Sequence, residues 1–189
     1  MVLHENVTEP MIDQLEDGRL DLAWMHTFGT IFPQSMLPKQ IEVKAMFTEA
    51  VLLAGPPHHR LAHQKHITWS SLQSEEFLLF KPGSGLRQVV LHLAQQAGFC
   101  PQVVFESGDI GSIRALVSEG VGISVFPKSV IDAPGRTLVP LDLLPALPHR
   151  TIQLAWHRQR ASTPTIQAFL DFVQEDLLIH PWTETTSDL

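Results

Sequence analysis

The sequence predicts an α/β protein with mainly parallel sheets flanked by helices, and three observations lead to this class. Helical and strand patterns alternate along the chain, several strands are continuous apolar runs, and glycines stand where the helices should end. Strands joined by helical crossovers run parallel, and continuous apolar strands are covered on both faces. The 189 residues, 44% of them hydrophobic, are enough for one domain or two small lobes.

The N-terminal region has the pattern of one strand–helix–strand unit. A strand is expected over residues 2–6, a helix over 8–18 and a second strand over 20–26. Thr8 is the expected N-cap, and Gly18 supplies the expected helix stop. This unit would place two parallel strands around one helix.

The middle of the chain predicts a longer unit of three strands and two helices. The first helix begins near Ser84 and stops at Gly98, and Asp109 caps the second, which stops at Gly120. The expected strands are 76–80, 102–106 and 122–126, and the helices are about 84–97 and 110–119. Further strands are expected at 41–47, 50–55, 137–141 and 151–156, with a C-terminal helix at 163–179.

Two glycines stand at the joint between the second helix of this unit and the strand that follows. Gly120 allows the helix to end in the left-handed conformation. Gly122 is expected to let the returning backbone pass close to that helix. Pro127 ends the strand.

Charge and cysteine content exclude several classes of protein. Thirteen Lys and Arg against twenty Asp and Glu give a formal charge of −7, which is the wrong sign for a surface that neutralises nucleic-acid phosphates. Cys100 is the single cysteine, so we expect a reduced, cytoplasmic compartment. The acidic N-terminus, without an apolar run, predicts neither a signal peptide nor a membrane span.

Candidate binding loops follow from the rule that α/β sheets bind ligands beyond the carboxyl ends of their strands. Residues 81–85, "KPGSG", are the most suggestive, because Gly83 lets a carboxylate or similar anion approach the helix start and Ser84 adds a hydroxyl. An ordinary N-cap turn explains the same residues equally well. The spacing is not that of a Walker motif.

Five segments in order carry a resemblance to a known family. They are "DGRLDLAWM", "PHHRLA", "FLLFKPGSGLRQVV", "AQQAGFCPQVVFE" and "IRALVSEGVGISVFPKS". This series resembles the effector-binding domain of LysR-type transcriptional regulators over nearly the whole chain. The resemblance implies a two-lobed, type II periplasmic-binding-protein-like fold that holds a small effector between the lobes. Lobe I would be 1–45 with 149–189, and lobe II 46–148.

The resemblance also implies ligand contacts at Thr8, His26, Gly83 and Ser84. Several family members that recognise carboxylates have Arg where this chain has His26, and a neutral imidazole binds an anion more weakly. This departure leaves the class of effector open, with an anion as one candidate. For His26 itself, an ordinary histidine at a strand end is the alternative reading.

The chain departs from the family pattern at its N-terminal side. Residues 1–40 lack the pattern of a winged helix-turn-helix, so DNA contact is expected only through such a domain outside this sequence. The family's effector domain also opens with a strand and helix upstream of residue 2. We therefore expect a truncated copy or fragment whose lobe I is one strand short, and an oligomer as the assembled form.

Other chemistries have weaker support in the sequence. Four histidines lie within 58–66, and His59 with His63 has the spacing of a metal pair on a helix, but a solvated loop without a metal is the preferred reading. No motif pairs Cys100 with a base, and no cofactor motif is present, so we expect a sensor and not an enzyme. An extracytoplasmic-type solute-binding protein is the first alternative, and a small α/β enzyme is the second.

Overall fold

The computed structural model describes residues 3–4, 6, 8–29, 31, 35, 37–160 and 163–179. The chain divides into two compact units, which are described separately: unit 1 comprises residues 1–48 and 151–189, and unit 2 comprises 49–150. The sequence places the lobe boundaries at 45/46 and 148/149, and the assignment of the units as lobes of a binding protein stays a prediction. Among the described residues, no helix has both the length and the apolar character needed to cross a membrane.

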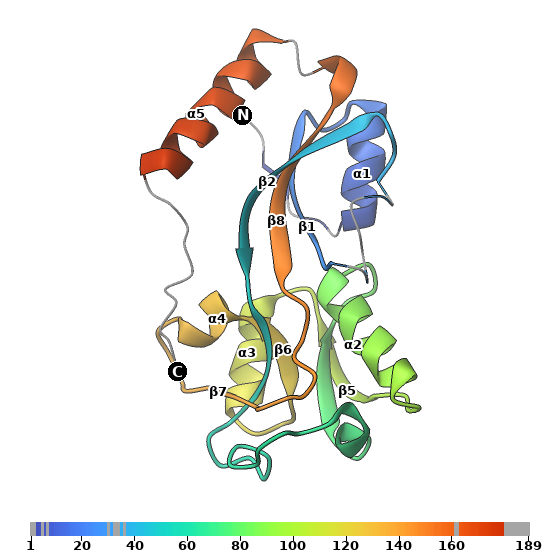
Figure 1. Cartoon of the computed structure of the whole chain (residues 1–189), viewed down its shortest axis with the longest axis vertical. Helices are drawn as coiled ribbons and strands as arrows, with labels where there is room; N and C mark the ends of the chain where they lie inside the picture. Colours follow the sequence, from blue (N-terminus) through green and yellow to red (C-terminus); the bar gives the residue numbers. More distant parts are fainter. Residues whose placement is uncertain are drawn as a thin grey trace. The chain divides into compact units, whose positions relative to one another are not determined.

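Unit 1 is built on a three-stranded sheet in the order β1-β8-β2 (Figure 1). β1 and β8 are antiparallel, with Leu22 opposite Trp156 and Thr27 opposite Thr151. The elements of this unit are α1 (Thr8–Asp17), β1 (Leu22–Thr27), β2 (Ile41–Glu49), β8 (Arg150–His157), the 3-10 turn η3 (Arg158–Arg160) and α5 (Pro164–Ile179).

Helix α1 covers one face of this sheet and supplies the core of unit 1. The buried apolar residues of this core come from α1, β1, β2 and β8, and they are Leu15, Ala23, Met25, Ile41 and Ala155. The helix ends where the sequence predicts, because Gly18 has φ +76°. The Arg160 guanidinium donates hydrogen bonds to the carbonyls of Leu15 (2.8 Å) and Glu16 (3.2 Å), which places a cation at the negative end of the helix.

Unit 2 contains most of the predicted strand and helix alternation. Its elements are β3 (Val51–Gly55), the 3-10 turn η2 (Trp69–Leu72), β4 (Glu76–Phe80), α2 (Gly85–Gln96), β5 (Gln102–Ser107), α3 (Ile110–Ser118), β6 (Ser124–Pro127), α4 (Lys128–Asp132) and β7 (Val139–Pro140). The predicted helix stops are confirmed, because Gly98 and Gly120 both have positive φ, +83° and +87°. The expected strand 137–141 is reduced to two residues, Val139–Pro140.

The sheets are mixed, which corrects the expectation of mainly parallel sheets. β4 and β5 are parallel, and a parallel bridge between Phe77 and Ile123 joins β4 to the start of β6. By contrast β3 is antiparallel to both β6 and β7. The parallel rule applies only to strands linked by a helical crossover, and neither β3 nor β8 is entered through one.

Gly122 makes a different close approach from the one that the sequence suggests. A Cβ atom at this position would lie 2.4 Å from the Glu76 carbonyl oxygen and 2.8 Å from the Leu78 side chain. The nearest neighbour of Gly122 is therefore strand β4, and the expected close approach to the preceding helix stays a prediction. The glycine allows Ile123 to donate to the Glu76 carbonyl at 2.9 Å and join the two strands.

The expected strand 2–6 falls partly outside the described residues. Leu3, His4 and Asn6, which are described, have no regular secondary structure. The parallel pairing that the sequence predicts for this segment and the strand at 20–26 therefore stays a prediction.

Candidate functional site

The carboxyl ends of β4 and β5 form the clearest candidate site in unit 2. The two strands are parallel neighbours, so the helices that follow them, α2 and α3, begin at the same edge of the sheet. The chain moves from β4 outward to β5 and then back past β4 to β6, so right-handed crossovers place α2 and α3 on opposite faces. Ligands of open α/β sheets bind at such a switch point.

Gly83 and Ser84 lie at the start of α2, as the sequence predicts. Gly83 has φ +88°, a conformation that favours glycine. Ser84 is the N-cap by position and backbone, but its hydroxyl makes no capping hydrogen bond in the described part of the chain. Both residues are partly exposed. The hydroxyl and the first N–H groups of α2, which have no intrahelical acceptors, can therefore donate to an acceptor-rich ligand group.

The start of α3, in contrast, is occupied by a side chain of its own. Asp109 accepts hydrogen bonds from the Ser112 hydroxyl (2.6 Å), the Ser112 N–H (2.8 Å) and the Gly111 N–H (3.3 Å). These bonds, led by that of the Ser112 hydroxyl, lower the pKa of Asp109 below its ordinary value. The carboxylate fills the anion position of α3, so α2 is the better candidate for a ligand.

Charged groups surround the start of α2. The Arg87 guanidinium, from the first turn, donates to the Phe80 carbonyl (2.9 Å) and pairs with Glu106. The backbone of Lys81, whose side chain is exposed, donates to the Ser107 carbonyl (3.1 Å) and so ties the two strand ends together. Arg87 is neutralised by its partner, which leaves the Lys81 ammonium as the cation nearest in sequence to Gly83 and Ser84.

Thr8 and His26 lie at the same end of unit 1 but on different faces of its sheet, because side chains alternate along β1 and Met25, next to His26, faces α1. Thr8 begins α1 and is 5% exposed. His26, near the end of β1, is half-buried, and its ring packs edge-on against Phe28 with centroids 5.2 Å apart. A helix that packs antiparallel to the next strand begins near that strand's end, so the two residues share one edge of the unit.

Two polar residues near this end were missed by the sequence reasoning. Gln153 of β8 donates from Nε2 to the Thr27 hydroxyl at 3.2 Å, and the two side chains are 4% and 5% exposed. The signal was present, since Gln153 interrupts the apolar run "TIQLAW" and Thr27 ends the strand "LAWMHT", directly after its apolar part and His26. A polar side chain in such a run is buried either with a hydrogen-bond partner or because it has a functional role.

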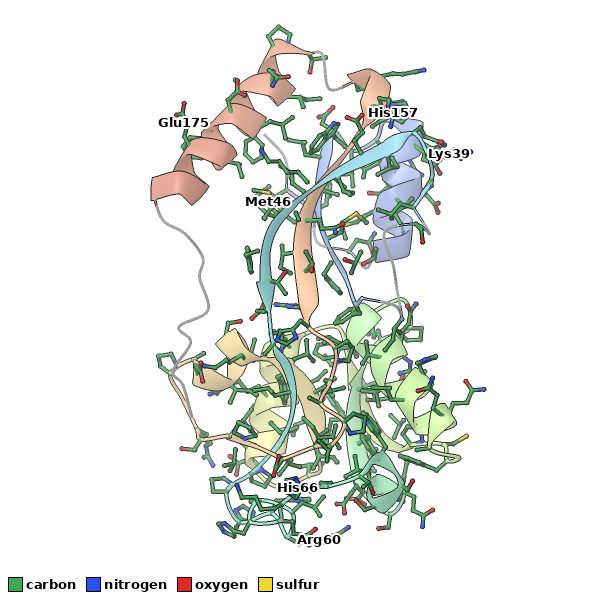
Figure 2. All side chains as sticks on the ribbon, viewed as in Figure 1. Lys39, Met46, Arg60, His66, His157 and Glu175 are labelled. Atoms are coloured by element: carbon green, nitrogen blue, oxygen red, sulfur yellow. The ribbon has the colours of Figure 1, made fainter. Side chains whose placement is uncertain are left out.

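The histidine-rich segment 58–66 forms turns between β3 and η2, where Figure 2 labels Arg60 and His66. His59 accepts from the Leu61 N–H at Nδ1 (3.3 Å), so its hydrogen is on Nε2, 3.3 Å from Glu75. Burial, followed by the charges on Arg60 and His58, lowers the pKa of His59. The segment is not helical, so the i, i+4 spacing of His59 and His63 no longer indicates a pair of metal ligands on one helix face. The described residues contain no group of His, Cys, Asp or Glu arranged to hold a metal.

Comparison with known proteins gives the family. The LysR substrate binding domain family matches residues 1–178. The chain belongs to this family. Among curated relatives, the transcriptional dual regulator GltC of Bacillus subtilis is 30% identical over 164 residues, which is 86% of this chain and 53% of that protein. The chain spans about half the length of the curated relatives it matches.

Solved structures of regulatory and effector-binding domains confirm the predicted α/β, type II periplasmic-binding-protein-like fold. The regulatory domain of Synechocystis CcmR, in complex with 2-PG, is similar with a TM-score of 0.74 at 22% identity, over 88% of this chain and 78% of that one. The effector-binding domain of QuiR, in complex with shikimate, has a TM-score of 0.72 at 21% identity, over 93% and 80%. At these identities the likeness shows the fold alone.

Proposed function

We propose that this chain is the effector-sensing part of a LysR-type transcriptional regulator. Thr8 and His26 from one lobe, and Gly83 and Ser84 from the other, would hold a small metabolite in a cleft between the lobes. The lobes of this proposal are residues 1–45 with 149–189, and 46–148. The observation that carries the proposal is the family match over residues 1–178, joined to the uncapped helix start at Ser84.

The chemistry at the start of α2 favours an effector with a carboxylate or phosphate group. Backbone N–H groups at a helix start and the partial positive charge of the helix bind anions. The Ser84 hydroxyl adds a donor, and Lys81 adds a nearby exposed cation. Because position 26 is not Arg, the start of α2 in unit 2 is the main place where the proposal has an anionic group bind.

Sensing would work through the relative geometry of the lobes. A metabolite that binds the closed arrangement more tightly than the open one shifts the population toward it by that difference in affinity. In a complete regulator this change would reach DNA through a helix-turn-helix domain outside this sequence and through an oligomer. The proposal further places the protein in the cytoplasm and assigns it no catalytic step.

Ligand-dependent melting of the 189-residue chain tests this function. Small carboxylates and phosphates are screened for an increase in Tm, and a ligand at about 100 times its Kd adds about 2.7 kcal/mol of stability. We expect Ser84→Trp, which fills the space at the helix start, to abolish the increase and leave the unliganded Tm nearly unchanged. Ser74→Trp, at an exposed turn residue of the same unit, is the matched control and should keep the increase. A shift that survives Ser84→Trp would rule out this site.

A further inference from the structure

Three polar residues of unit 1 are buried: Thr8 at the start of α1, and Thr27 and Gln153, which contact each other across β1 and β8. Thr8, Thr27 and Gln153 are 5%, 5% and 4% exposed, whereas the rest of this sheet face is packed with apolar residues against the helix. Buried polar groups cost free energy unless each one is hydrogen-bonded. A cluster of this kind inside an apolar core therefore calls for a partner.

The strand register shows where the Gln153 side chain is directed. Gln153 is opposite Met25 and its Nε2 donates to the Thr27 hydroxyl, two residues further along β1. Its carboxamide therefore reaches toward the carboxyl end of β1. On this face Met25 belongs to the cluster that α1 covers.

Helix geometry places the start of α1 at the same level. The turn at 18–21 joins the end of α1 to the beginning of β1. From there α1 extends back about 14 Å to Thr8, at 1.5 Å per residue. Along β1, Met25 lies about 10 Å and Thr27 about 17 Å from Leu22. The first turn of α1 thus lies beside the carboxamide, between the levels of Met25 and Thr27.

One atom of this cluster has no partner. Gln153 Oε1 is buried and accepts no hydrogen bond from any residue that the structure describes. In the first turn of α1 the backbone N–H groups of Thr8 and Glu9 come before the intrahelical bonds of the helix, whereas Pro10 has no N–H. The Gln153 Oε1 acceptor and the N–H donors at the start of α1 together suit a ligand group that both donates and accepts a hydrogen bond.

We propose that Gln153 is a specificity residue that accepts a hydrogen bond from a hydroxyl group of the effector. This inference rests on the proposed function. The effector hydroxyl would donate to Gln153 Oε1 and accept from an N–H group at the start of α1. A carboxylate has no proton to donate, so its oxygen would be repelled by Oε1. With an anionic group at the start of α2, the effector class is a hydroxylated carboxylic acid or phosphate ester.

The test compares acids that differ by a hydroxyl. Malate and succinate, lactate and propionate, and 2-hydroxyglutarate and glutarate are each added to the whole chain, and Tm and Kd are measured. For the pair that binds most tightly, we expect the hydroxyl to improve Kd by about tenfold, the value of one hydrogen bond made in a buried site. In Gln153→Met, which keeps the volume and removes the amide, the ratio should fall to about one.

Met25→Leu is the matched control, because Met25 is the buried cross-strand partner of Gln153 and carries no hydrogen-bonding group. This variant should keep the tenfold preference. If Gln153→Met does not fold, Thr27→Val removes the hydroxyl that holds the carboxamide and should also reduce the preference.

Each remaining outcome is decisive. A hydroxyl preference that persists in Gln153→Met overturns the inference and leaves Gln153 as a structural amide or the partner of an internal water. Equal binding of both members of every pair also overturns it, while the Tm shifts themselves would uphold the proposed function. No Tm shift with any of the acids would count against both.

Discussion

At the scale of single residues, a buried ion pair marks the points where the chain passes between the two units. The Glu49 carboxylate, 8% exposed as a residue, accepts from Arg150 Nε at 2.8 Å and from the Ser129 hydroxyl at 2.8 Å. The hydroxyls of Thr48 and Thr151, the adjoining residues, lie 3.1 Å apart. Glu49 and Arg150 are the first and last residues of unit 2, so this pair joins the two ends of that unit.

We expect Glu49→Gln to lower the free energy of unfolding by about 2 to 3 kcal/mol. The amide keeps the shape of the side chain but leaves the Arg150 guanidinium, 18% exposed, without its anion, and loss of one partner of a buried pair is costly. Urea unfolding at neutral pH measures the change.

Asp132→Asn is the control for this experiment. It removes an exposed i,i+4 partner of Lys128, with the Asp132 side chain 58% exposed, and should cost about 0.5 kcal/mol or less. Equal losses in the two variants would show that the Glu49 pair contributes no more than a surface pair.

At the scale of elements, local patterns predicted most of unit 2. Strand 76–80 was predicted with its observed bounds, and the Asp109 cap and the stops at Gly98 and Gly120 are confirmed. These features depend on neighbours within a few residues, which a sequence displays directly. Strand orientation in β3 and β8 was not predicted, because it depends on which distant strands meet.

The candidate site was predictable to a similar extent. Gly83 and Ser84 could be placed at a helix start from turn chemistry alone. The pairing of Gln153 with Thr27 could not, since it joins residues 126 positions apart. Only the presence of each polar residue next to or within an apolar run was visible beforehand.

Gly122→Ala tests the contact between β6 and β4. An added methyl group would press on the Glu76 carbonyl oxygen, which is backbone and cannot move independently. We expect the strands to separate at the Ile123–Glu76 hydrogen bond, with a loss of about 2 kcal/mol or more in the free energy of unfolding. Thermal or urea unfolding measures it.

Gly111→Ala provides the matched comparison within the same unit. The nearest atom to a Cβ there is an Asp109 carboxylate oxygen at 3.5 Å, an ordinary contact, and alanine in a helix is favoured over glycine. This variant should be neutral or slightly stabilised. A similar stability for Gly122→Ala would mean that β4 and β6 tolerate a side chain between them.

At the scale of the whole molecule, the proposed function requires both units to meet one ligand. Thr8 and His26 belong to unit 1, and Gly83 and Ser84 to unit 2. The family match covers both units. A site confined to either unit would leave the ligand unable to bias the geometry between them, which is the proposed mechanism of sensing.

Nuclear magnetic resonance of the isotope-labelled chain tests this claim most directly. The acid or phosphate with the largest Tm increase is titrated, and the backbone amide signals of Thr8, His26, Gly83 and Ser84 are followed. The account predicts that the signals of both units move with one shared Kd, and that Ser84→Trp abolishes both movements. Signals that move in one unit while the other stays unchanged at saturation would contradict it.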